Sequence, residues 1–235
     1  MSRSEPSRNP LPFWKRTLDL ICILFLAPAL LPLMAVVAMV VRLASRGPIL
    51  FRQERIGLNA RPFICYKFRT MRVSADTGSH QAHLENLMSN GKPMEKLDVI
   101  DDRITPGGLL LRASGLDELP QVFNIIKGEM SFVGPRPCVP YEYQKFKLEH
   151  RARFDAVPGL TGLWQVSGKN TTTFQQMIDL DIAYGRQLSL WRDIGILFRT
   201  FPVLFQQVIQ MMRKKWARLA NKHKIGSSGS NNSRV

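Results

Sequence analysis

Two adjacent carboxylates, Asp117 and Glu118, are the residues of this sequence best suited to chemistry. They stand between apolar residues in the segment 116–121, with basic residues at Arg103 and Arg112. Neighbouring side chains on a helix point about 100° apart, so one acid could act as a nucleophile and the other as a base. Holding both ionised in a partly apolar place requires cations or a metal ion nearby. A solvated helix start explains the same pair, and the pattern alone favours that simpler explanation.

Basic residues on extended or stiff backbone form the second candidate group. Lys67 and Arg69 alternate along an extended segment and so point to one side. Arg136 lies between Pro135 and Pro137, whose rings stiffen the turn. Arginine matches phosphate oxygens through its planar fork, and a rigid backbone lowers the entropy cost of aiming it. These residues suit a site for a phosphorylated ligand, although the pattern alone favours explaining each of them as a surface cation.

The charge of the chain predicts an anionic partner. Its 235 residues include 33 Lys and Arg against 18 Asp and Glu, which gives a net charge of +15. Such a chain suits nucleic acid, an anionic membrane surface or a phosphorylated substrate. Hydrophobic residues make up 45% of the sequence, which is ordinary for one folded domain and excludes a disordered chain.

Several common functional motifs are missing from the sequence. It contains neither a phosphate-binding Walker loop nor a Rossmann glycine fingerprint. The three cysteines are an odd number without metal-binding spacing, which argues against a disulfide framework or a zinc site and fits a reducing compartment. The four histidines form no convincing ligand set; the residues concerned are Cys22, Cys65, Cys138, His80, His83, His150 and His223.

An uncharged apolar segment, Leu20 to Val41, suggests contact with a membrane. As a straight helix it would be roughly 33 Å long, enough to cross a hydrocarbon core of about 30 Å. Pro28 and Pro32 lie in its middle, where a kink or break is expected. Basic residues flank both ends, which places both ends in the cytoplasm. A re-entrant segment that bends at the prolines and a kinked spanning helix both stay open; the flanking residues are Arg3, Arg8, Lys15, Arg16, Arg42, Arg46, Arg52, Arg55 and Arg61.

The remaining sequence predicts an α+β fold that is mostly helical, with one short β-hairpin. Extended residues 49–51 and 63–66 flank a turn around Gly57, Asn59 and Ala60. Helical stretches are expected at 109–128, 141–154 and 174–188. Residues 194–212 have an amphipathic pattern followed by Trp216 and a basic cluster, which suits a helix on an anionic membrane, although a core helix with a solvated tail fits too.

We therefore expect four regions along the chain. Residues 1–12 form a flexible arm, and 13–47 a helix–break–helix membrane segment. Residues 48–212 form the cytosolic-face domain with interfacial helices, and 213–235 a basic tail that is disordered at its end.

Four longer motifs resemble one bacterial protein family. They are Tyr-Lys-Phe-Arg-Thr-Met at 66–71, Asp-Asp-Arg-Ile-Thr-Pro-Gly-Gly at 101–108, the segment 116–137, and the segment 157–170. In this order and combination they resemble the bacterial sugar transferases, the monotopic phosphoglycosyl transferases. The closest type is the short form that primes exopolysaccharide with galactose phosphate.

The resemblance implies a reaction and its partners. A sugar 1-phosphate would move from a UDP-sugar donor to a polyprenol (undecaprenyl) phosphate acceptor, with release of UMP. Asp117 would be the nucleophile that carries a covalent phosphosugar, and Glu118 would assist proton removal or help hold the metal. Mg²⁺ is the expected cofactor, bound by Asp117 and Glu118 and offsetting phosphate charge.

Substrate-binding roles follow from the same resemblance. Lys67, Arg69, Arg112 and Arg136 would supply cations to the diphosphate, with Pro135 and Pro137 shaping the turn. We further expect Arg112 to pair with a later acid such as Asp193.

The family resemblance also implies a topology. The chain would enter one leaflet of the bacterial inner membrane from the cytoplasmic face through a re-entrant helix. Pro28 takes the position of the break, and Pro32 is an addition. One departure is Gly115, which stands where the family has Ser, so the helix start could be looser.

Two other functions are weighed against this one. A non-catalytic basic membrane adaptor of a polysaccharide assembly complex explains the charge but not the clustering of Asp117 and Glu118 with Lys67 and Arg136. Nucleic-acid binding is disfavoured by the apolar segment. A homodimer is left open.

Overall fold

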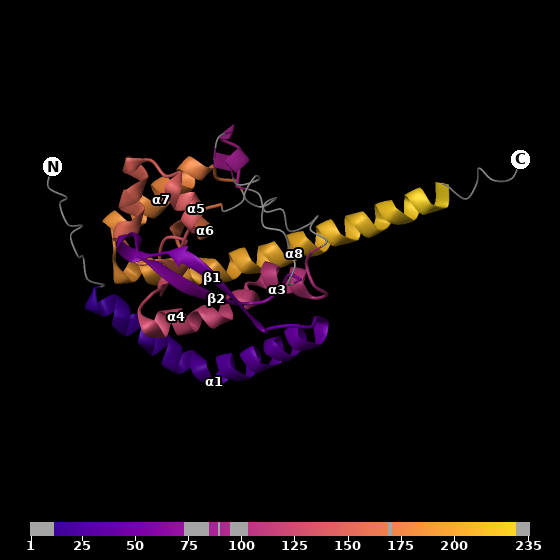
Figure 1. The fold of residues 1–235 in the computed structure, drawn as a ribbon, viewed down its shortest axis with the longest axis horizontal. Coiled ribbons are helices and arrows are strands. Elements are labelled where there is room, and N and C mark those ends of the chain that lie inside the picture. The colour runs from indigo at the N-terminus through magenta and orange to yellow at the C-terminus, as the bar shows by residue number, and fades with distance from the viewer. Residues whose placement is uncertain (1–11, 73–84, 89, 95–102, 169–170, 229–235) are drawn as a thin grey trace, which may run out of the picture.

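The computed structural model describes residues 12–72, 85–88, 90–94, 103–168 and 171–228. Residues 1–11 of the expected N-terminal arm and residues 229–235 of the expected tail lie outside the described residues. Within it the fold is mostly helical, with one antiparallel hairpin and one short parallel strand pair (Figure 1). The α+β class and its hairpin are therefore confirmed.

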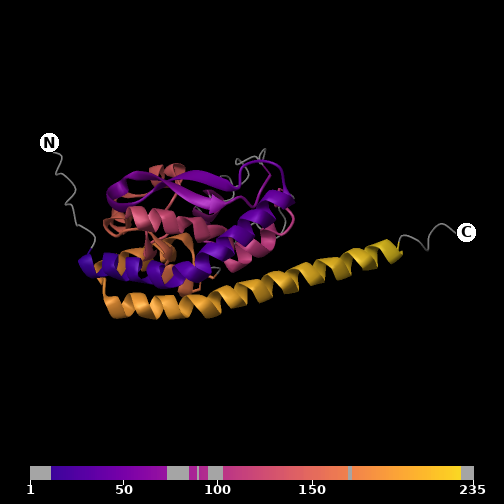
Figure 2. The same cartoon turned by 90° about the horizontal axis from the view of Figure 1, so that it is seen from below.

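Helix α1, Phe13–Ala44, is the predicted membrane segment. It continues through Pro28 and Pro32 as one helix and bends part-way along, so the expected break is a bend (Figures 1 and 2). Its middle is apolar on nearly every side, and most of these side chains are exposed: Leu24, Phe25, Leu26, Leu31, Val36, Met39, Val40 and Leu43. A soluble helix would bury such a surface, so α1 is built for an apolar environment.

Strands β1, Leu50–Ile56, and β2, Pro62–Phe68, form the predicted hairpin. Their antiparallel register pairs Leu50 with Phe68 at one end and Ile56 with Pro62 at the other. A short 3₁₀ turn, η1, Leu58–Ala60, joins them, with Asn59 and Ala60 at positive φ. Asparagine tolerates that conformation well, which explains why the turn forms here.

The carboxylate segment lies between two short helices. Helix α3, Gly108–Ser114, precedes the 3₁₀ helix η3, Leu116–Gln121, and α4, Val122–Lys127, follows it. Gly115 links α3 to η3 in the left-handed conformation, with φ 74°. Glycine adopts this conformation without steric cost, so Gly115 suits the sharp change of direction between the two helices.

A parallel strand pair organises the remaining chain. Strands β3, Ser131–Val133, and β4, Gly159–Thr161, pair in parallel, and α5, Pro140–Gln144, with the 3₁₀ helix η4, Leu148–Asp155, fills the connection. Helices α6, Leu163–Val166, and α7, Phe174–Arg186, follow. The largest core cluster lies among these elements and holds Ile56, Cys138, Phe146, Phe154, Trp164, Phe174, Met177 and Ile178.

Helix α8, Leu190–Ser228, includes the predicted amphipathic segment but extends well beyond it. Its C-terminal part projects away from the rest of the molecule, where the sequence had suggested a tail (Figures 1 and 2). Residues 13–44 and 190–213 are both long and apolar enough to cross a membrane by length and composition. Large apolar side chains along α8 are exposed: Trp191, Phe198, Phe201, Phe205, Met212 and Trp216.

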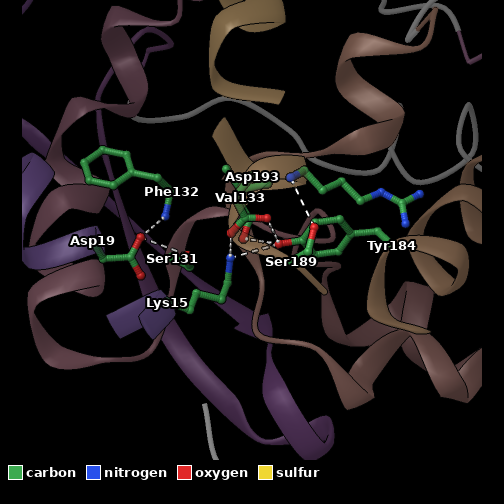
Figure 3. A network of polar contacts seen from close by, with 9 residues as sticks. Lys15, Asp19, Ser131, Phe132, Val133, Tyr184, Ser189 and Asp193 are labelled. Carbon is green, nitrogen blue, oxygen red and sulfur yellow. Dashed lines mark hydrogen bonds and ion pairs between the residues drawn. The ribbon is translucent and has the colours of Figure 1, made fainter. Parts of the chain in front are cut away.

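A buried polar network fastens the start of α1 to the domain (Figure 3). The Lys15 ammonium forms an ion pair with Asp193 of α8, and each side chain is only 1% exposed. The Tyr184 hydroxyl of α7 accepts from Lys15 at 2.9 Å and donates to Asp193 Oδ1 at 2.7 Å. One turn later, Asp19 Oδ1 accepts from the Ser131 hydroxyl at 2.9 Å and the Phe132 amide at 3.0 Å.

The far end of α1 is held by the same domain. Val37 and Val41 are buried against Phe68 of β2 and Leu111 of α3. The Arg69 guanidinium donates to the Ser45 carbonyl oxygen at 2.7 Å, just beyond the helix. Both ends of the apolar helix thus rest on one domain.

The buried pair yields a stability prediction. Lys15→Met leaves the Asp193 carboxylate buried without a cation, which should lower the free energy of unfolding by about 3–5 kcal/mol. Adding Asp193→Asn should recover most of this loss, because the amide oxygen still accepts from Tyr184. Denaturant unfolding in detergent micelles measures both. Lys147→Met, at a lysine that is 73% exposed, is the control and should change stability by less than about 1 kcal/mol. Equal stability of Lys15→Met and the wild type would contradict the role of the pair.

Candidate active site

Helix η3 presents Asp117 and Glu118 to different surroundings beside strand β2. Asp117 is buried, with 7% of its surface exposed. The Glu118 side chain is 31% exposed, and its Oε1 lies 2.6 Å from the Lys67 ammonium of β2. The tight turns of η3 therefore place one acid in the protein and the other at its surface beside a cation, which suits two separate chemical roles.

Asn124 of α4 fixes this arrangement and was not singled out from the sequence. It is fully buried, and its Oδ1 accepts from the Tyr66 amide at 3.1 Å while its Nδ2 donates to the Ile64 carbonyl at 2.6 Å and to Glu129 at 2.7 Å. These bonds tie β2 to the helix that follows η3. The sequence signal was a polar residue inside the apolar stretch Val-Phe-Asn-Ile-Ile at 122–126.

Burial raises the pKa of the Cys65 thiol on β2, and the charges of Lys67, Arg55, Glu118 and Arg136 act on the same thiol. Of the predicted site residues, the structure brings Lys67 and Glu118 into contact, and Arg136 lies near enough for its charge to act on Cys65. Arg55 joins them as a cation that sequence analysis did not assign to the site.

The Pro-Arg-Pro turn follows β3 and depends on a close approach of two backbones. A Cβ built on Gly159 would lie 2.0 Å from the Gly134 nitrogen, and one on Gly134 would lie 2.2 Å from the Val157 carbonyl oxygen. Pro135 and Pro137 are buried, while Arg136 is half-buried. Glycine at 134 and 159 therefore lets β4 press against the turn that carries Arg136.

Arg69 takes a different position from the one expected. Its guanidinium donates to the carbonyl oxygens of Ser45 and Arg46, the latter at 2.9 Å, and to the Ser45 hydroxyl at 2.9 Å. Because these groups lie at the carboxyl end of α1, Arg69 holds the membrane helix against the hairpin. Substrate contact by Arg69 stays a prediction.

The expected pairing of Arg112 with Asp193 is wrong. Asp193 is engaged by Lys15 and Tyr184, as described above. The Arg112 Nη1 instead lies 3.4 Å from the Thr70 hydroxyl, close to the end of β2. The sequence showed that Arg112 and Asp193 have opposite charges. It did not show that Asp193 pairs with Lys15, which lies 178 residues away in the chain.

The donor set fits Mg²⁺ only with help from a substrate. Among the described residues, no group of three or more His, Cys, Asp or Glu side chains comes together. Mg²⁺ is commonly bound through one or two carboxylates plus substrate phosphates and waters. Asp117 and Glu118 supply that number of carboxylates, so they are the residues that would hold the ion.

Comparison with known proteins decides the family. The family model described as bacterial sugar transferase matches residues 11–207, well over half of the chain. The chain belongs to the bacterial sugar transferase family. The match includes α1, the hairpin, both carboxylates and the Pro-Arg-Pro turn, and it ends within α8.

Individual relatives of this sugar transferase carry related names. A galactosyl transferase CpsE of Streptococcus agalactiae is 43% identical over 159 residues, which cover 67% of this chain and 35% of that protein. An undecaprenyl-phosphate galactose phosphotransferase of Salmonella typhimurium is 37% identical over 202 residues, covering 83% and 41%. A UDP-glucose:undecaprenyl-phosphate glucose-1-phosphate transferase of Caulobacter vibrioides is 40% identical over 198 residues, covering 81% and 69%. The chain thus spans well under half the length of the Streptococcus and Salmonella proteins.

The close backbone approach yields the prediction for this site. Gly159→Ala adds a methyl group against the Gly134 nitrogen, so β3 and β4 must separate, and the free energy of unfolding should fall by about 3 kcal/mol. Gly195→Ala is the control. Gly195 lies in helix α8, and a Cβ built on it would meet no atom within 4 Å. That control should match or slightly exceed wild-type stability. Thermal unfolding in detergent measures both, and equal melting temperatures for the two variants would refute the close-packing argument.

Proposed function

We propose that this sugar transferase moves a sugar 1-phosphate from a UDP-sugar to undecaprenyl phosphate with release of UMP, the priming step of exopolysaccharide synthesis. The observation that carries the proposal is the pair on η3, with Asp117 buried and Glu118 bound to Lys67 at 2.6 Å. The names of the Salmonella and Caulobacter relatives, which join undecaprenyl phosphate to galactose and glucose transfer, support the substrate classes.

Asp117 is the nucleophile in this mechanism. Its carboxylate oxygen attacks the phosphorus nearer the sugar, a phosphorus–oxygen bond forms, and the bond to the UMP oxygen breaks. UMP leaves with that electron pair, and the sugar phosphate stays on Asp117 as an acyl phosphate. A phosphate oxygen of undecaprenyl phosphate then attacks the same phosphorus, which frees Asp117 and gives a polyprenyl diphosphate sugar.

The surrounding cations serve the first step, the attack on the donor, and Glu118 serves the second step, the attack by the acceptor. Glu118 accepts the proton of the acceptor phosphate, and its ion pair with Lys67 holds it at the site. Lys67 and Arg136 offset the charge of a diphosphate approached by a carboxylate. When bound by Asp117 and Glu118, Mg²⁺ would supply further positive charge to the diphosphate oxygens.

We also propose that α1 is re-entrant and that the site faces the cytoplasm at the inner membrane. A spanning helix places its ends on opposite sides of the bilayer, whereas one domain holds Lys15 and Val41 of α1. Basic residues at both ends support the cytoplasmic side. The exposed aromatic residues of α8, followed by a basic stretch with no Asp or Glu after Asp193, suit an anionic membrane surface.

A non-catalytic membrane adaptor is less well supported. It would use the apolar helices and the basic stretch, but it needs no buried carboxylate beside a Lys–Glu pair.

Asp117→Asn should abolish transfer, because a neutral amide cannot attack the phosphorus. We expect UMP release from a panel of UDP-sugars to fall by at least 10³-fold in membrane-embedded protein with undecaprenyl phosphate and Mg²⁺. Glu118→Gln should still form the phosphosugar intermediate but pass it on slowly. Asp179→Asn, an exposed acid on α7, is the control and should keep full activity.

Two outcomes would count against this mechanism. UMP release that survives in Asp117→Asn would move the nucleophile elsewhere. A folded wild-type protein that releases no UMP from any donor would favour the adaptor.

A further inference from the structure

The backbone around Arg136 is held at four consecutive carbonyl groups. The Pro135 oxygen accepts from the Gly159 amide at 2.9 Å, and the Cys138 oxygen accepts from the Ile56 amide at 2.8 Å. Between them, the Arg136 oxygen accepts from Arg153 Nη2 at 2.9 Å and the Pro137 oxygen accepts from Arg55 Nη1 at 3.1 Å. The two outer bonds come from backbone, whereas the two inner ones come from arginine side chains.

Arg153 reaches the turn from η4 and is itself fixed by α7. Its side chain is 2% exposed, and the same Nη2 lies 2.6 Å from Asp181 Oδ2, also buried. The rings of Phe146 and Phe154 lie under the guanidinium, at 5.2 and 5.7 Å from its central carbon. Among the described residues, the Arg153 Nε and the Asp181 Oδ1 have no hydrogen-bond partner. Arg153 is therefore held by its ion pair with Asp181 and by its hydrogen bond to the Arg136 carbonyl oxygen.

Arg55 reaches the neighbouring carbonyl from β1. Its Nη2 donates to Gln53 Oε1 at 2.6 Å, which orients the guanidinium toward Pro137. Burial and the nearby charge of Arg136 lower the pKa of Arg55. Arg55 and Arg153 are both buried cations near the positively charged Arg136, which is electrostatically unfavourable. Neutral donors would be enough to stabilise the turn alone.

We propose that Arg153 and Arg55 are positioning residues that fix the backbone of Arg136 and Pro137, so that the Arg136 side chain meets the donor diphosphate from a preset direction. This inference rests on the proposed function, because it assigns Arg136 to the UDP-sugar. Because the turn is already fixed before the donor binds, binding does not have to order it and loses less entropy. Arg153 and Arg55 therefore affect binding of the donor and not of the lipid acceptor.

A double-mutant cycle between Arg153 and Arg136 tests the proposal. Arg153→Lys keeps the charge, but the lysine side chain ends about one bond short of the Nη2 that contacts both Asp181 and the Arg136 carbonyl. We expect it to weaken UDP-sugar binding and raise the donor KM about tenfold, with the undecaprenyl phosphate KM unchanged. In an Arg136→Ala background, adding Arg153→Lys should change donor binding less than twofold, because the side chain being aimed is absent.

Controls separate positioning from folding. Arg151→Lys, on the same 3₁₀ helix but exposed and over Tyr143, should leave donor binding and both KM values unchanged. Should Arg153→Lys fail to fold, Arg55→Lys takes its place in the same cycle, since it releases the Pro137 carbonyl instead. Equal effects of the lysine substitution with and without the Arg136 side chain would overturn the proposal, as would an equal rise in both KM values.

Donor binding is measured by calorimetry with UDP-galactose and UDP-glucose, which needs no turnover. A wild type that binds a donor but releases no UMP contradicts the proposed function and leaves the binding cycle to decide the positioning role. A wild type that binds neither donor overturns the positioning proposal directly.

Discussion

The ion pair between Lys15 and Asp193 is the interaction on which the rest of the structure depends. It joins the first turn of the apolar helix α1 to α8. The Tyr184 hydroxyl of α7 contacts both members of the pair and lies 3.1 Å from the Val133 carbonyl oxygen of β3. Burial and the Asp193 charge raise the pKa of Tyr184, so its hydroxyl stays protonated and donates. A buried pair is costly to desolvate and is tolerated when further hydrogen bonds satisfy it, as they do here. One network thus fixes a helix built for lipid against the strand that leads into the Pro-Arg-Pro turn.

The two ends of α1 connect the membrane segment to opposite parts of the site. Its start is tied to β3, which leads into the turn that carries Arg136, and its end is tied by Arg69 and Phe68 to β2, which carries Lys67. The η3 carboxylates lie beside β2, where Glu118 contacts Lys67. A water-soluble sugar nucleotide and a lipid-borne acceptor must meet at a membrane surface. Because α1 and the residues proposed to bind phosphate are held by one domain, the proposed transfer needs no large rearrangement to bring them together.

Local patterns in the sequence predicted most of the elements and part of the site. The hairpin followed from two β-rich runs around Gly57 and Asn59, and α7 from the helical stretch expected at 174–188, which ends at Arg186 in the structure. The group of Glu118 with Lys67 and Arg136 came from motifs, and the structure brings Glu118 and Lys67 into contact. Partners of buried charges could not be predicted in this way. Lys15 and Asp193 lie 178 residues apart, and nothing local distinguishes Lys15 from other basic flanking residues. The same limit explains why Arg112 was paired with Asp193 and why the contact of Arg69 with the end of α1 was not predicted, since a sequence shows charges but not the direction of side chains.

The central claim is that one domain holds both ends of α1 on the same side of the membrane. Single cysteines at Phe13→Cys and Arg46→Cys, both at exposed positions, test it on a Cys22→Ser background in which Cys65 and Cys138 are buried. A membrane-impermeant maleimide is applied from the periplasmic side and, separately, to inverted vesicles. If both ends of α1 lie on the cytoplasmic side, both positions react only in inverted vesicles. Reaction of one position from the periplasmic side and the other from the cytoplasmic side would show a spanning helix and contradict it.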